Sequence, residues 1–314
     1  MEWSLLGVGC VLALQGLVFV LLYYFYRSGV ATSREASDRK GGYANVALSE
    51  PRGGAHRGNG GRDTAAAAAA SSSSSLSSLS SSSSCDSTLA ISVVNPQFGD
   101  AHTFTLFWLH GLGDTAEGWR DGVAAMQIRH TRVVLPTAPV RPVTINGGMA
   151  MNAWFDIAGL TIGAREDVSG IDEACTALAA LIKKEIAAGI APERIAIGGF
   201  SQGGAVALHT VFVKGFLDQK IGAVVGLSSW LPRGAQILRG GRNMPKMSSV
   251  NASTPVFMGH GTNDPMVQVQ FGELSAKILK DGGAPTTWKT YRVQHTTCAR
   301  EMIDVRAFLS EQLK

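Results

Sequence analysis

The pattern of hydrophobic positions divides the chain into three stretches. An uncharged, largely apolar run extends from Ser4 to Tyr26, and a polar stretch rich in Gly, Ala and Ser continues to Ser87. Short apolar runs then alternate with polar segments as far as the C-terminus. This division predicts an N-terminal segment at 1–27, a linker at 28–88 and a folded domain at 89–314. A domain of roughly 220 residues is large enough to bury a full core.

Within the folded domain, runs of β-branched and aromatic residues alternate with segments of helical period, a pattern typical of a parallel sheet covered by helices. The predicted strands are Thr103–Leu109, Arg132–Leu135, Arg194–Gly198, Ala223–Leu227, Pro255–Gly259 and Thr287–Tyr291. The predicted helices are Ile171–Ala188, Gly203–Val213, Phe271–Asp281 and Arg300–Leu313. We therefore expect an α/β domain with a mostly parallel central sheet flanked by helices. Its functional residues should follow the carboxyl ends of the strands.

The N-terminal run predicts a transmembrane helix. A helix from Ser4 to Tyr26 is long enough to cross a hydrocarbon core of ~30 Å, and aromatic residues stand at its ends, as interfacial anchors do. A cleaved signal peptide is the alternative, but it would require a basic start and a small-residue cleavage site. Glu2 is the only charged residue before the run. We expect an uncleaved single-pass anchor.

The orientation of this anchor follows from the charges beside it. Arg27, Arg34, Arg39 and Lys40 come after the run and no basic residue precedes it, so the positive-inside rule predicts a catalytic domain facing the cytosol. The four cysteines are scattered and show no paired spacing, which is typical of reduced thiols. Cleavage of the segment would instead leave a cytoplasmic or secreted domain.

The net charge of +4 belongs to the linker. From Arg27 to Arg62 there are seven Lys or Arg against three Asp or Glu, so the folded domain is nearly balanced. The Gly, Ala and Ser runs of this stretch predict a disordered, flexible linker. No zinc spacing or aromatic RNA-binding signature accompanies its arginines, and we expect no nucleic-acid partner.

Gly199-Phe200-Ser201-Gln202-Gly203 is the clearest chemical motif. It follows a predicted strand and opens a predicted helix, which is the structural context of the G-x-S-x-G nucleophile elbow of the α/β-hydrolase fold. The motif alone is common by chance, but its position between strand and helix favours Ser201 as a nucleophile.

A serine nucleophile needs a base and an orienting acid, which this fold supplies in the order Ser, Asp, His. Asp264 follows the strand Pro255–Gly259, and His295 lies between the last predicted strand and the last helix. We predict a triad of Ser201, Asp264 and His295.

The segment Leu109–Asp114 follows the first predicted strand, where this fold supplies a backbone N–H group to the oxyanion hole. We assign that hole to the amides of Leu112 and Gln202. His110 precedes the nucleophile in the chain, and we expect it to shape the loop and not to act as the base.

These motifs, with others of the folded domain, resemble the acyl-protein thioesterase and lysophospholipase family, the phospholipase/carboxylesterase group of α/β hydrolases. The resemblance runs from about Val93 to the C-terminus. The further motifs are Trp119, Pro136–Pro139, Pro142–Thr144, Trp154–Asp156, Leu227–Pro232, His260-Gly261 with Asp264-Pro265, and Cys298 with Glu301-Met302. The resemblance implies the same triad, and hydrolysis of acyl thioesters on palmitoylated proteins or of lysophospholipid esters.

The chain departs from the family pattern in two places. The loop Tyr291–His295 is shorter than usual and lacks a Gly, which bears on the placement of the base. The predicted anchor and linker are also unusual, since relatives typically begin near the first strand and reach membranes by reversible lipidation. A permanent anchor could replace that device.

The acyl chain is expected in an apolar groove near the elbow. Its candidate walls are Leu112, Met151, Trp154, Ile157 and Leu231, most of which could equally be core residues. The expected substrates are S-acylated proteins or lysophospholipids, with no metal or organic cofactor. A short-chain carboxylesterase and a membrane-tethered, non-catalytic binding module remain as alternatives, and the sequence leaves the oligomeric state open.

Overall fold

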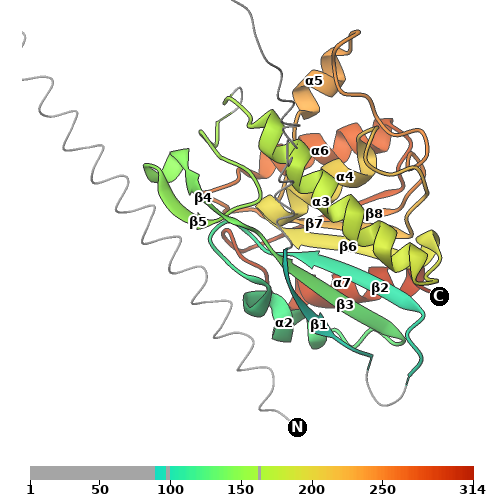
Figure 1. Cartoon of the computed structure of the whole chain (residues 1–314). Helices are drawn as coiled ribbons and strands as arrows, with labels where there is room; N and C mark the ends of the chain where they lie inside the picture. Colours follow the sequence, from blue (N-terminus) through green and yellow to red (C-terminus); the bar gives the residue numbers. More distant parts are fainter. Residues whose placement is uncertain (1–88, 97–99, 162–163) are drawn as a thin grey trace, which may run out of the picture. The chain divides into compact units, whose positions relative to one another are not determined.

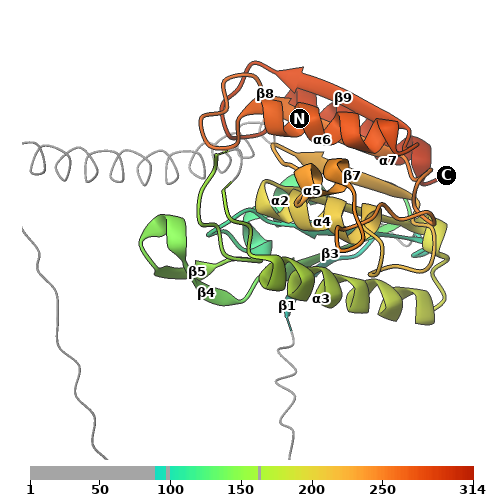
Figure 2. The same cartoon turned by 90° about the horizontal axis from the view of Figure 1, so that it is seen from above.

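The computed structural model describes residues 89–96, 100–161 and 164–314, and is built on a seven-stranded sheet in the order β1-β3-β2-β6-β7-β8-β9 (Figure 1). Its strands are β1 (Ala90–Val94), β2 (Phe104–Leu109), β3 (Thr131–Thr137), β6 (Ile195–Phe200), β7 (Ala223–Leu227), β8 (Val256–Gly261) and β9 (Thr286–Tyr291). Only the edge strand β1 runs antiparallel to its neighbour. A separate hairpin of β4 (Val140–Val143) and β5 (Met149–Asn152) projects from the body of the domain (Figures 1 and 2).

Helices cover both faces of the sheet. They are α2 (Ala116–Ala124), α3 (Val168–Ala187), α4 (Gln202–Phe212), α5 (Gly234–Arg239), α6 (Val269–Asp281) and α7 (Ala299–Gln312), with short 3₁₀ turns at Thr144–Asn146 and Pro192–Arg194. Residues of α3, α4 and α6 join one hydrophobic cluster, and residues of α2 and α7 join a second cluster on the opposite face. Because both faces are covered, every residue of β2, β6, β7 and β8 is buried.

The structure confirms the predicted α/β fold and its mostly parallel sheet. Each predicted strand and helix corresponds to an observed element, with ends that differ by up to three residues. Sequence patterns missed the short and half-exposed elements, namely β1, the β4–β5 hairpin, α2 and α5. These elements carry weak signals, because β4 contains Pro142 and α5 has only six residues.

Among the described residues no helix combines the length and the apolarity that crossing a membrane requires. The predicted anchor at 1–27 and the predicted linker at 28–88 lie outside those residues.

A buried carboxyl group lies where the last helix begins. Glu301, in the first turn of α7, is only 1% exposed. Its side chain lies against Gly259 of β8, where a Cβ atom would collide with the carboxyl group. Burial raises the pKa of Glu301 to about 8; repulsion from Asp304 adds to this shift and the Cys298 N–H opposes part of it. The side chain is therefore largely protonated at neutral pH.

Replacing Glu301 with Gln should stabilise the fold increasingly as pH rises from about 4.5 to about 8. Below this range the carboxyl is protonated in both states; within it, only the unfolded chain releases the proton, which favours unfolding. Above it the difference should stay constant, at roughly 2–4 kcal/mol. Urea unfolding across this pH range measures the effect, and Glu311→Gln, at an exposed position on the same helix, controls for the lost charge. An equal difference between Glu301→Gln and the parent at all pH values would contradict this account.

Candidate active site

Ser201 occupies a strained turn between β6 and α4. Its backbone angles are φ 53° and ψ −120°, a region that a residue with a side chain rarely adopts. The Ser201 N–H donates to the Leu227 carbonyl oxygen at 2.8 Å, and the Ser229 hydroxyl donates to the Ser201 carbonyl oxygen at 2.8 Å. These bonds to β7 and the segment after it hold the turn, as expected of a nucleophile elbow.

The two glycines of the motif allow backbones to approach at this turn. A Cβ on Gly199 would collide with the backbone of Gly203, and a Cβ on Gly203 would collide with the carbonyl oxygens of Leu109 and His110. Only glycine fits at either position. The close approach at Gly203 brings the loop after β2 against the start of α4, next to Ser201.

The structure brings Ser201, His295 and Asp264 together in one hydrogen-bonded chain. His295 Nε2 lies 3.0 Å from Ser201 Oγ, and His295 Nδ1 lies 2.7 Å from Asp264 Oδ2. The Ser201 and Asp264 residues are only 9% and 8% exposed. A carboxylate oxygen can only accept a hydrogen bond, so the pairing favours Nδ1 as the protonated ring nitrogen and Nε2 as the acceptor of the serine proton.

Asp264 is held by the loop that follows β8. Its Oδ1 atom accepts the N–H groups of Met266 and Val267, each at 2.9 Å. The buried His260 closes this loop, because its Nε2 donates to the Val267 carbonyl oxygen at 2.8 Å and lies 3.5 Å from Asp264 Oδ2. Burial lowers the pKa of His260, which favours the neutral ring.

The shortened loop before His295 still delivers the ring to Ser201. The N–H groups of Thr262 and Asn263 donate to the carbonyl oxygens of Tyr291 and Val293, at 2.8 and 3.1 Å. These bonds tie the loop to the end of β8. The Phe200 ring lies against the imidazole, with ring centroids 4.8 Å apart. Main-chain bonds to β8 thus position the loop despite the missing Gly.

The two amides expected at the oxyanion hole belong to the residue after Ser201 and to the loop after β2, which packs against the start of α4. Gln202 is the first residue of α4, where a backbone N–H has no partner within the helix. In the described part of the chain the Leu112 N–H donates to no acceptor, and an ideal Cβ on the preceding Gly111 would lie 3.5 Å from Ser201 Cβ. Both donors remain available to a developing oxyanion.

His110 takes the structural role expected of it. The Ala138 N–H donates to His110 Nε2 at 3.0 Å, so Nδ1 carries the proton and donates to the Gly111 carbonyl oxygen at 2.7 Å. Burial lowers the pKa of His110 to about 4, while the Gly111 carbonyl partly opposes that shift. A neutral ring with both nitrogens engaged fixes the loop and leaves no lone pair for proton transfer.

The candidate acyl-groove residues separate into two groups. Ile157 and Leu231 line a cavity of about 380 Å³. Trp154, Met151 and Leu112 do not line it. Trp154 is 1% exposed and donates its indole N–H to the His110 carbonyl oxygen at 2.9 Å, so it is a core residue that supports the loop.

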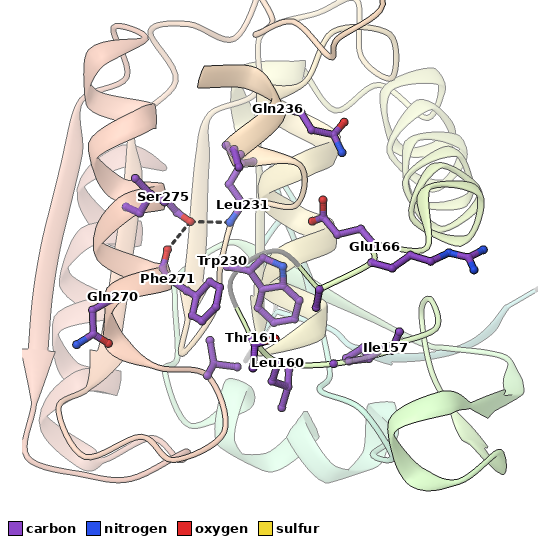
Figure 3. A pocket seen from close by; sticks show the side chains of 18 of the residues that line it. Ile157, Leu160, Thr161, Glu166, Trp230, Leu231, Gln236, Gln270, Phe271 and Ser275 are labelled. Atoms are coloured by element: carbon purple, nitrogen blue, oxygen red, sulfur yellow. Dashed lines mark hydrogen bonds between the residues drawn. The ribbon is translucent and has the colours of Figure 1, made fainter. Parts of the chain in front are cut away.

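The cavity lies between α5, α6 and the segment before α3 (Figure 3). Its larger apolar side chains are Phe155, Ile157, Leu160, Trp230, Leu231, Met266, Val267, Phe271, Leu274 and Ile278. Two connections join it to the site: Trp230 directly follows Ser229, which bonds to Ser201, and the cavity-lining Met266 and Val267 donate to Asp264. One hydrogen-bonded loop therefore forms part of the cavity wall and holds the acid of the triad.

Sequence reasoning missed several residues of this site. His260 is one of them, and its position four residues before Asp264, at the end of a buried strand, is a signal that could have identified it. Phe271 and Leu274 lie one turn apart on α6, whereas Trp230 lies in the loop after β7, and no linear spacing connects that loop to α6. Among the described residues, no cluster of His, Cys, Asp and Glu side chains could hold a metal ion.

Comparison with known proteins places these residues in a family. The sequence profile of the phospholipase/carboxylesterase family matches residues 90–313. Acyl-protein thioesterase 1 of Gibberella zeae is 40% identical over 222 residues, which cover 68% of this chain and 92% of that protein. Acyl-protein thioesterase 1 of Mycosarcoma maydis is 37% identical over 244 residues, covering 72% of this chain and 98% of that protein.

Solved structures agree with the sequence comparison. The crystal structure of Zea mays acyl-protein thioesterase 2 superimposes with a TM-score of 0.63 at 30% identity, covering 72% of this chain and all of that one. The family profile spans more than two thirds of the chain, including the strained serine turn and both other members of the hydrogen-bonded chain. The chain belongs to the phospholipase/carboxylesterase family of α/β hydrolases.

Proposed function

We propose that this protein is a serine hydrolase that cleaves fatty-acyl thioesters of S-acylated proteins or the acyl esters of lysophospholipids. The observation that carries the proposal is the hydrogen-bonded chain from Ser201 through His295 to Asp264. A serine hydroxyl becomes a useful nucleophile when an oriented base can take its proton. The strained turn adds to this by presenting Ser201 beside two free backbone amides.

The first half of the reaction transfers the acyl group to the protein. His295 Nε2 takes the Ser201 proton as Oγ attacks the acyl carbonyl carbon, and Asp264 stabilises the imidazolium that forms. The carbonyl oxygen becomes an oxyanion and accepts the N–H groups of Leu112 and Gln202. When the tetrahedral intermediate collapses, the carbon–sulfur or carbon–oxygen bond breaks. His295 returns the proton to the leaving thiolate or alkoxide.

The second half releases the fatty acid. Water gives a proton to His295 Nε2 and attacks the acyl-serine carbonyl, and the same two amides stabilise the new oxyanion. Collapse of this intermediate breaks the bond to Ser201 Oγ, which regains a proton from His295. Each half-reaction uses the groups present in the site and balances without a further co-reactant.

The cavity beside the triad suits the acyl chain (Figure 3). Its wall is mostly apolar, and each methylene group moved from water into such a wall contributes about 0.8 kcal/mol. The Ser275 hydroxyl accepts from the Leu231 N–H at 2.8 Å and donates to the Phe271 carbonyl oxygen at 2.6 Å, so this part of the wall presents no unsatisfied polar group. Such a wall favours long acyl chains over acetyl.

Relatives support the thioester class. The similar proteins of Gibberella zeae and Mycosarcoma maydis carry the name acyl-protein thioesterase 1, whereas the family name also includes carboxylesterases. A carboxylesterase of small esters is therefore the second candidate. The acyl-length preference separates the two, because a short-chain optimum would not use the cavity.

We propose further that the N-terminal run anchors the protein in a membrane with the hydrolase domain facing the cytosol. The support is the uncharged run Ser4–Tyr26 and the basic residues that follow it. Such an anchor would keep the hydrolase near substrates whose acyl chains are themselves embedded in lipid. Protease protection of the full chain in sealed microsomes tests the orientation.

Replacing Ser201 with Ala should lower kcat for a palmitoyl thioester by a factor on the order of a thousand or more. Without Oγ there is no acyl-enzyme, and labelling by a fluorophosphonate should disappear as well. The free energy of unfolding should not fall, because Ala fits the same turn. Substantial turnover by a folded Ser201→Ala protein would refute the assignment, and a wild-type protein that turns over neither thioesters nor esters would favour the non-catalytic alternative.

Replacing Leu274 with Asp should reduce the preference for long acyl chains. Leu274 lines the cavity but is 41% exposed, so the fold should tolerate the change. We expect kcat/KM for palmitoyl to fall roughly tenfold or more, while that for acetyl stays within about twofold. A series of thioesters from acetyl to palmitoyl measures this selectivity. The matched control is Ile303→Asp, at a 59% exposed position on α7; equal losses at all lengths would place the acyl chain elsewhere.

A further inference from the structure

The segment that begins with α5 carries an unusual set of exposed side chains. Leu238 and Met244 are apolar and are 56% and 38% exposed, and the cationic Arg239, Arg242 and Lys246 are also exposed. We call these five side chains the α5 surface. Figure 1 shows α5 at the upper edge of the domain, above α6 and α4. Of these five side chains, the proposed acyl-binding cavity includes only Arg239.

The charge of this part of the chain is one-sided. No Asp or Glu occurs between Asp218 and Asp264, a stretch that contains Lys220, Arg233 and the three cations of the α5 surface. Within the described residues, none of those three cations forms an ion pair with a carboxylate. Their charge is therefore available to an anionic partner.

The apolar side chains give a second signal. A single exposed Leu is ordinary on a protein surface, but here Leu238 and Met244 are interspersed with the three cations within nine residues. Gly240 and Gly241 lie between them with φ values of 61° and 131°, so the segment turns sharply within this short distance. Apolar side chains interspersed with Lys and Arg are typical of surfaces that bind at the boundary between lipid headgroups and acyl chains.

The α5 surface borders the acyl cavity. Arg239 of the α5 surface lines the cavity. Two other residues of α5, Ala235 and Gln236, line it too. Leu274 of α6 lines the cavity as well and is partly exposed. A bilayer in contact with the α5 surface would therefore meet the rim of the cavity.

From these observations we infer that the α5 surface docks on an anionic lipid bilayer and delivers bilayer-embedded acyl chains to the cavity. This inference rests on the proposed hydrolase function. We favour a bilayer over an acidic protein as the partner because apolar side chains are interspersed with the cations. Of the three cations, only Arg239 lines the cavity.

The test uses the full chain, reconstituted in vesicles of phosphatidylcholine alone or with added phosphatidylserine. Two substrates are compared, a palmitoyl-thioester peptide with no net charge embedded in the bilayer and a water-soluble short-chain thioester. We expect phosphatidylserine to raise the rate on the embedded peptide and to leave the soluble substrate unaffected. Amide hydrogen exchange in peptides covering 234–250 should slow only in the anionic vesicles.

The decisive variant is Arg239→Gln/Arg242→Gln/Lys246→Gln. Each cation near an anionic bilayer contributes ~1 kcal/mol, so removing three should abolish the phosphatidylserine effect and lower the rate on the embedded peptide roughly tenfold or more. Leu238→Ser/Met244→Ser should lower that rate in both kinds of vesicle. The control Lys183→Gln/Lys184→Gln/Lys220→Gln removes three exposed cations near the amino ends of β6 and β7 and should behave as wild type.

Several results would overturn the inference. One is a wild-type rate that phosphatidylserine leaves unchanged, and another is a control variant that loses as much activity as the α5 variant. In a second series of peptides with added acidic residues, a loss in the α5 variant that grew with the acidity of the peptide and not with phosphatidylserine would identify an acidic protein segment as the partner. Failure of the proposed function is distinguishable, because it would abolish Ser201-dependent turnover of the soluble thioester as well.

Discussion

The strained turn at Ser201 is the constraint on which the rest of the site depends. A residue with φ 53° and ψ −120° persists only where its surroundings hold it. Here β7 supplies the carbonyl of Leu227, Ser229 binds the Ser201 carbonyl, and Gly203 lets the loop after β2 pack against α4. The same contacts that hold the turn also bring in the oxyanion loop and the residues leading to the cavity.

Asp264 connects the catalytic chain to the acyl cavity. Its two oxygens have different partners: Oδ2 binds His295, while Oδ1 binds the backbone of Met266 and Val267, which line the cavity. His260 fixes the far end of this loop through the Val267 carbonyl. A shift of Met266 or Val267 in the cavity wall can therefore move Asp264 and, through it, the His295 ring. The three hydrogen bonds involved are the two to Asp264 Oδ1 and the one between Asp264 Oδ2 and His295 Nδ1. In the proposed reaction, the cavity wall would therefore affect the orientation of His295 as well as contact the acyl chain.

Two buried titratable side chains near the site are uncharged at neutral pH. His110 and Glu301 are held near the two loops of the site in uncharged forms, because burial shifts each pKa towards the neutral state. Neutral supports cost less to bury than charged ones. The polar groups that support the two loops are therefore uncharged.

The sequence by itself determined the α/β fold, the buried strands and the three residues of the catalytic chain. These follow from local signals: apolar runs of strand length, a glycine-flanked serine between strand and helix, and an Asp and a His at strand ends. The tertiary structure alone decided the cavity, the place of Trp154 in the core and the support of Asp264 by His260. Their residues come from α5, α6 and separate loops, and the distances between such elements depend on packing, which no linear spacing encodes. The position of the shortened loop before His295 also depends on tertiary structure. Main-chain bonds to the residues after β8 hold the loop, although it is shorter than in related proteins.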